Sequence, residues 1–134
     1  MDKLTRSSAP ATILALLLFG APLVFAFSVP YYPTGFYGWF VPAGEYVQLK
    51  WDDNDPEDEV DYYLVQRADG LDGEFYTIDS CVVDKSGDSY TYYQDWTVDP
   101  EEEDYYQYRA KAHNCSGWSG WSEHEIVAVY PEKK

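Results

Sequence analysis

Residues 105–122, YYQYRAKAHNCSGWSGWS, restrict the possible folds of this chain more than any other stretch. Tyrosines and small residues alternate here with Gln107, Arg109 and Lys111, and a hairpin rich in Gly, Ser and Trp follows. Such alternation is typical of a β-strand that has one buried face and one face in water. The stretch therefore predicts a sheet protein.

Six further runs alternate in a similar way, with turn residues between them, and no run has a convincing helical period. The predicted strands are residues 34–40, 45–51, 61–67, 74–82, 89–95, 105–113 and 122–130. Seven short strands in about a hundred residues predict an all-β, seven-stranded antiparallel sandwich of the immunoglobulin-like type.

The first 26 residues have the order of a secretory signal peptide, because Lys3 and Arg6 precede an apolar run that ends near the small residue Ala26. The alternative is an uncleaved signal anchor, but the run is shorter than the roughly 20 residues of a spanning helix and contains Pro22. No second hydrophobic span follows. Cleavage after Ala26 would leave an N-terminal extension (27–32), one domain (33–130) and a C-terminal tail (131–134). We expect the mature protein to be secreted to the cell exterior, and the periplasm and the cell surface are alternative locations.

The composition is strongly acidic, with 24 Asp and Glu against nine Lys and Arg and a formal net charge of −15. Such a surface repels nucleic acid and anionic lipid, which excludes both as partners. It would attract cations or a basic partner, and it is equally consistent with a salty habitat.

Two cysteines, Cys81 and Cys115, occur in a chain predicted to reach an oxidising compartment, so we predict a disulfide between them. In an immunoglobulin-like sandwich, the predicted strands that end near these cysteines would flank residues 61–67. Their separation of nearly 10 Å exceeds the reach of a disulfide, so the pairing requires the loops to bend. Asn114 begins a glycosylation sequon, which matters only in a eukaryotic host.

The motifs Val47-x-Leu49-x-Trp51, Tyr63-x-Val65-x-Arg67, Tyr93-x-Asp95 and Tyr106-x-Tyr108-Arg109-Ala110-Lys111-Ala112, in this order, resemble a fibronectin type III domain over residues 33–130. The resemblance implies that Trp51 is the core tryptophan. It also implies that the hydroxyl of Tyr106 ties the preceding loop to the sheet, as in a tyrosine corner. Two features depart from the family pattern, namely the two cysteines and the high number of aromatic residues in the N-terminal segment 31–40.

Residues 118–122 form a literal W-S-x-W-S string, similar at this point to class I cytokine receptors, in which the tryptophans interleave with cationic side chains. Arg109 and Lys111 lie on the outward face of the expected neighbouring strand, so we expect cation–π contacts with Trp118 and Trp121. Two roles stay open, namely stiffening of a loop and a ligand-facing patch. Receptor kinship is disfavoured because a second, cysteine-bonded domain and a membrane span are missing from the sequence.

Tyr62 and Leu64 are predicted to share the outer face with Arg109 and Lys111. This gives a candidate binding surface of Tyr62, Leu64, Arg109, Lys111, Trp118 and Trp121. Cross-strand packing explains the tyrosines equally well without a ligand.

Two other features have weaker functional interpretations. The acidic loop 52–59 has the oxygen ligands that calcium requires but not the spacing of a helix–loop–helix site, so a solvated loop is the favoured interpretation and no metal is predicted. His113 and His124 have no nucleophile in a recognisable setting, so we predict neither catalysis nor a cofactor.

The sequence thus favours a non-catalytic binding module with an extracellular protein partner that the sequence does not identify. A carbohydrate-associating module is the alternative, motivated by Tyr31, Tyr32, Tyr37 and Trp39. A structural spacer or envelope component is the third possibility.

Overall fold

The computed structural model describes residues 28–132, so the predicted signal peptide lies outside the described residues. These residues form eight strands and one 3₁₀ helix. The elements are β1 (Tyr37–Val41), β2 (Tyr46–Asp52), η1 (Pro56–Asp58), β3 (Tyr62–Asp69), β4 (Tyr76–Val82), β5 (Tyr90–Asp95), β6 (Asp104–Asn114), β7 (Gly117–Trp118) and β8 (Glu125–Val129). No helix among them is long and apolar enough to span a bilayer.

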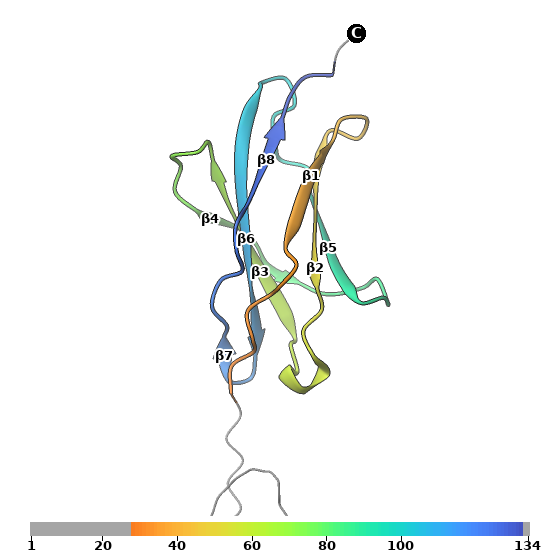
Figure 1. Cartoon of the computed structure of the whole chain (residues 1–134), viewed down its shortest axis with the longest axis vertical. Coiled ribbons are helices and arrows are strands. Elements are labelled where there is room, and N and C mark those ends of the chain that lie inside the picture. Colours follow the sequence, from red (N-terminus) through yellow and green to blue (C-terminus); the bar gives the residue numbers. More distant parts are fainter. Residues whose placement is uncertain (1–27, 133–134) are drawn as a thin grey trace, which may run out of the picture.

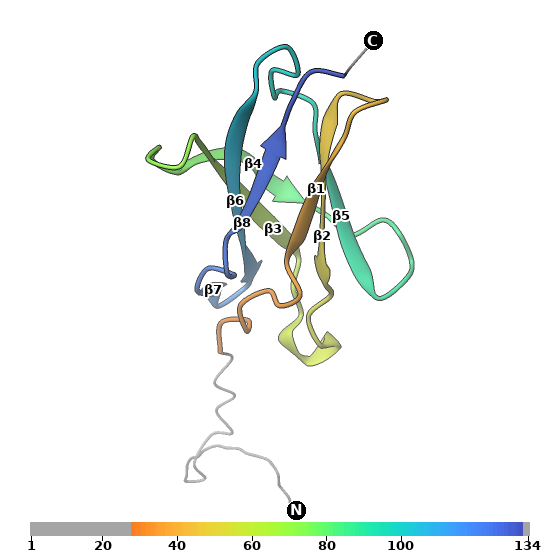
Figure 2. The same ribbon diagram turned by 45° about the horizontal axis from the view of Figure 1, so that its top comes forward.

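The strands form two antiparallel sheets that pack face to face (Figure 1). Sheet A has the order β1-β2-β5, and sheet B has the order β4-β3-β6 with both β7 and β8 paired to β6. In Figure 2, β8 lies beside one half of β6 while β7 lies near its other end, close to the first described residues. The predicted all-β sandwich is confirmed.

The core consists of the inward side chains of the strands, as the alternation predicts. Val47, Leu49 and Trp51 of β2 are fully buried, and Trp51 stacks on Phe36 with ring centroids 5.5 Å apart. From sheet B, a second set of buried residues faces them: Tyr63, Val65, Tyr106, Tyr108, Ala110 and Ala112. Together these side chains fill the space between the sheets, and their burial on one face of each strand fixes the register.

Tyr106 forms the tyrosine corner that the resemblance implies. Its hydroxyl accepts a hydrogen bond from the backbone N–H of Asp99, with N and O 3.1 Å apart. The bond ties the loop between β5 and β6, which crosses from sheet A to sheet B, to the start of β6.

The last predicted strand is shorter than expected, because β8 begins at Glu125 and not at Ser122. The hydroxyls of Ser119 and Ser122 accept hydrogen bonds from the backbone N–H groups of Ala112 and Ala110, at 2.8 and 2.9 Å. The two serine N–H groups in turn donate to the carbonyls of the same alanines, each at 2.8 Å. Side chains and backbone together therefore replace the strand ladder along this part of β6.

The predicted disulfide between Cys81 and Cys115 is wrong in this structure, since both cysteines are free and exposed. Cys81 lies on β4 and Cys115 follows β6, and β3 lies between these two strands. Two strand spacings amount to roughly 9.5 Å, whereas bridged Cα atoms lie within about 7 Å of one another. The loops do not bend to close this gap.

Candidate binding surface

The outer face of sheet B brings the predicted binding residues together. In the register of β3 and β6, Tyr62 lies opposite His113, Leu64 opposite Lys111 and Gln66 opposite Arg109. The side chains at these positions are all half-buried. Trp118 on β7 and Trp121 in the following loop lie on the same face, next to the edge of β6 that is opposite to β3.

Cations and aromatic rings alternate along this face. The Arg109 guanidinium carbon lies 4.2 Å from the ring centre of Phe75 and 4.0 Å from that of Trp121. The Lys111 ammonium lies 4.5 Å from Trp121 and 5.0 Å from Trp118. Each cation is thus held between two rings, which is the interleaving that the sequence predicts. We call Phe75, Arg109, Trp121, Lys111 and Trp118 the cation–aromatic ladder.

The ladder continues into a second group of rings at the end where β7 lies. His113 packs edge-on against Trp118 and stacks flat on Tyr62, with centroids 4.6 and 4.4 Å apart. The His113 Nδ1 atom also lies 2.8 Å from a carboxylate oxygen of Asp61. A continuous row of rings and cations therefore crosses the outer face of sheet B.

Hydrogen bonds hold the ladder in place. Arg109 donates from Nε and Nη2 to the side-chain oxygen of Gln66, at 3.0 and 2.8 Å. Burial between the two rings lowers the pKa of Arg109 from its ordinary value, yet a guanidinium remains charged at neutral pH. Neither Arg109 nor Lys111 forms a salt bridge with any residue in the range 28–132.

Sequence reasoning missed three members of this surface. Phe75 belongs to the predicted strand 74–82, but β4 begins only at Tyr76, and nothing in the sequence placed the Phe75 ring over Arg109. Gln66 and His113 could be found from the strand register, because each lies directly opposite a residue that was predicted. Leu64 shares the face, as predicted, but is not part of the ladder.

In the described part of the chain, no group of three or more His, Cys, Asp or Glu side chains is arranged to hold a metal ion. His113 is engaged by Tyr62 and Asp61, and His124 faces the ring of Phe75.

The Asn114 side chain, where the sequon begins, is buried. Its amide nitrogen donates to the carbonyls of Ser28 and Asp58 at 2.9 and 2.8 Å. In the folded domain, this side chain is therefore not available for glycosylation.

Comparison with known proteins identifies the architecture. No family model and no curated protein matches the sequence. An Fn3-like protein from Clostridium thermocellum matches in structure with a TM-score of 0.59 and 24% identity, over 80% of this chain and 99% of that one. The chain has the fibronectin type III fold.

Two further structures agree with this assignment. A human fourth FNIII domain matches with a TM-score of 0.54 and 17% identity, over 96% of this chain and 95% of that domain. The twitchin kinase region from C. elegans matches with a TM-score of 0.60 and 20% identity, over 78% of this chain but only 17% of its own length. At these identities, the likeness shows the fibronectin type III fold and nothing about partners.

Proposed function

We propose that this chain is a secreted, non-catalytic module that binds an acidic segment of another protein at the cell exterior. The fibronectin type III fold commonly serves as an interaction or spacer module. The contact surface is the cation–aromatic ladder together with Tyr62 and Leu64.

The observation that carries this proposal is that two cationic side chains of the ladder are held in place but not neutralised by a described carboxylate. In a chain with a net charge of −15, Arg109 and Lys111 lie fixed between rings and form no salt bridge within the described residues. A carboxylate of a partner can approach them without displacing one from the described residues 28–132. Because the side chains are already ordered, binding costs little conformational entropy. Tyr, Trp and Arg are also the residues most often found at interface hot spots.

The test is capture of proteins from the native extracellular fraction by the purified chain, followed by identification of what is retained. We compare Arg109→Gln/Lys111→Gln with a charge-matched control, Lys50→Gln/Lys85→Gln, whose residues lie in and beside sheet A. The ladder variant should lose the partner while the control keeps it, and capture should weaken with salt. Equal capture by both variants would reject this surface.

Thermal unfolding of the same variants separates binding from stiffening. If the ladder only stiffens the loop, the variant Arg109→Gln/Lys111→Gln will melt at a lower temperature but capture the same proteins. A chain that captures nothing in any form supports the spacer interpretation instead.

A further inference from the structure

The outer face of sheet A carries a second surface with a different chemistry. Its outward side chains form rows across the three strands: Tyr37, Lys50 and Tyr92 in one row, and Trp39, Gln48 and Gln94 in the next. Tyr46 follows beside Trp96, with ring centroids 4.3 Å apart, and Tyr90 lies under the Lys50 ammonium at 4.4 Å. We call this surface the aromatic platform.

The rings of the platform are open to solvent. Tyr37, Tyr92 and Trp96 are 52%, 41% and 58% exposed, and the rings of Tyr37 and Trp39 lie 5.4 Å apart. The ladder differs, because its rings already cover cations of the same chain. A large exposed apolar area on a folded domain marks a surface that contacts a partner or a ligand.

The charge of the platform indicates the kind of ligand. The outward positions of β1, β2 and β5 hold a single carboxylate, Asp52, although the chain has 24 acidic residues. Lys50 and the amides of Gln48 and Gln94 are the other polar groups, and Gln94 donates to the side-chain oxygen of Gln48 at 3.1 Å. Asp88, from the loop before β5, accepts a hydrogen bond from the Tyr92 hydroxyl at 3.4 Å. A face of rings and amides with so few charges suits an uncharged ligand that offers both C–H surfaces and hydroxyl groups.

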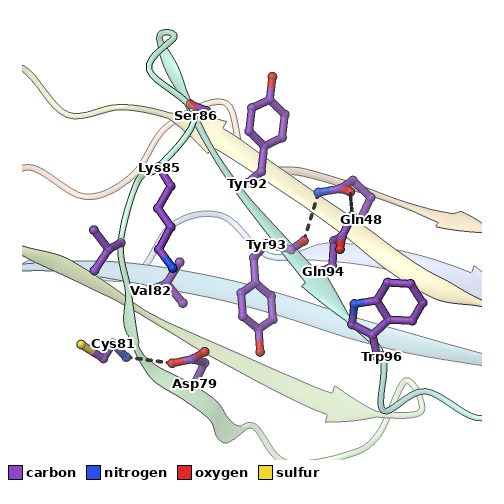
Figure 3. A pocket seen from close by; sticks show the side chains of 11 residues that line it. Gln48, Asp79, Cys81, Val82, Lys85, Ser86, Tyr92, Tyr93, Gln94 and Trp96 are labelled. Carbon is purple, nitrogen blue, oxygen red and sulfur yellow. Dashed lines mark hydrogen bonds between the residues drawn. The ribbon is translucent and has the colours of Figure 1, made fainter.

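A cleft extends the platform at the edge of β5 (Figure 3). It encloses about 650 Å³, which is within the usual range for ligand pockets. Tyr92 and Gln94 line it from β5, and Trp96 lines it from just after β5. On the other side, Asp79, Lys85 and Ser86 line it from β4 and the loop that follows. The cleft therefore combines a ring for stacking with carboxylate, ammonium and hydroxyl groups that can hydrogen-bond to hydroxyls.

We propose that the aromatic platform and this cleft bind an uncharged polysaccharide, with sugar rings stacked on Trp39, Tyr92 and Trp96. The C–H faces of pyranose rings pack on aromatic faces, and the side-chain amide of Gln94 hydrogen-bonds to the sugar hydroxyls. The Gln48 amide positions Gln94, because its nitrogen donates to the carbonyls of Leu49 and Tyr93 and its oxygen accepts from Gln94. Of the four residues that suggest a carbohydrate site in the sequence, only Tyr37 and Trp39 lie here. Tyr31 and Tyr32 stack on one another beside the acidic loop.

The experiment measures binding of the purified full chain to a panel of insoluble uncharged polysaccharides, namely cellulose, chitin and starch, and to soluble oligosaccharides of each by calorimetry. We expect binding to at least one of the three. Trp39→Ala/Tyr92→Ala and Trp96→Ala should each lower the association constant roughly tenfold or more, as expected for the loss of a stacking contact. Tyr92→Phe keeps the ring and should keep most of the affinity.

Tyr105→Ala is the matched control, because Tyr105 is an equally exposed tyrosine on sheet B. Binding should be unchanged in this variant, in the ladder variant Arg109→Gln/Lys111→Gln and at high salt. The last two results distinguish the platform from the proposed protein-binding surface. Circular dichroism confirms that each variant is folded.

Three results would overturn the proposal. These are no binding to any of the three polysaccharides, equal binding by the platform variants and the wild type, and self-association that Trp96→Ala abolishes. The last result would show that a second copy of the chain covers this face.

Discussion

Arg67 on β3 reaches across the sandwich to Asp95 at the end of β5, and its Nη1 donates to a carboxylate oxygen of Asp95 at 2.8 Å. Both side chains are buried, and the hydroxyl of Tyr108 donates to the same oxygen at 2.8 Å. Since β3 and β5 belong to different sheets, this ion pair joins the two layers at one end of the core.

Loss of the arginine should therefore strongly destabilise the domain. Arg67→Met leaves the buried carboxylate of Asp95 without a counter-charge, and breaking a buried pair in this way costs about 3–5 kcal/mol. Chemical unfolding monitored by tryptophan fluorescence measures the free energy of unfolding. Asp69→Asn is the control, because Asp69 pairs with the same arginine but its side chain is half-exposed, so its loss should cost about 1 kcal/mol or less. If Arg67→Met and Asp69→Asn lower the free energy of unfolding by the same amount, the buried pair has no special role.

The same carboxylate should make stability depend on acid pH. Burial alone would raise the pKa of Asp95, but hydrogen bonds from Thr97, Arg67 and Tyr108 outweigh it and lower the pKa below the ordinary value of 3.8. The folded state thus favours the ionised form. The contribution of the Asp95 carboxylate to the free energy of unfolding is complete above about pH 4. It is lost as the pH falls through the pKa that Asp95 has in the folded state.

This expectation is checked with Asp95→Asn, which cannot ionise. The stability advantage of the wild type over this variant, from urea unfolding at a series of pH values, should be constant near neutrality and should shrink below about pH 4. An advantage that does not change with pH would mean that the pKa of Asp95 is not lowered by folding.

The serines of the W-S-x-W-S string should stabilise the domain through their hydroxyls. Ser119→Ala removes the acceptor of the Ala112 N–H, and an unsatisfied buried N–H costs about 1–3 kcal/mol. Hydrogen exchange at the Ala112 amide should become faster together with this loss. Ser116→Ala, at an exposed position in the adjacent turn, should change neither quantity. Unchanged exchange in Ser119→Ala would show that the hydroxyl is not needed.

The alternation of apolar and polar residues along each strand was sufficient to predict the fold and part of the candidate surface. Alternation places Trp51, Tyr63, Val65, Tyr106 and Tyr108 inside because each strand has one buried face, and the structure buries all five. The same alternation puts Arg109 and Lys111 outside, next to the tryptophans. These predictions depend only on the local geometry of a strand, which the sequence determines directly.

Contacts that depend on loops or on the order of strands were not predictable. Arg67 lies on the same inward face of its strand as Tyr63 and Val65, as alternation predicts. Nothing in the sequence, however, selects Asp95 from 24 acidic residues as its partner. Phe75 reaches Arg109 from the irregular segment just before β4. The aromatic platform requires β1, β2 and β5 to be neighbours, although a long stretch of chain separates β5 from the other two.

Finally, the cysteines allow a direct chemical test of whether the disulfide is absent. With β3 between Cys81 and Cys115, both thiols should react with Ellman's reagent in the native state, giving two reactive thiols per chain. Cys81→Ser and Cys115→Ser should each remove one reactive thiol and leave the melting temperature under oxidising conditions unchanged, because no cross-link is lost. A native chain without reactive thiols, whose non-reduced peptide map joins the two cysteines, would show that the loops do bend and that the bond forms.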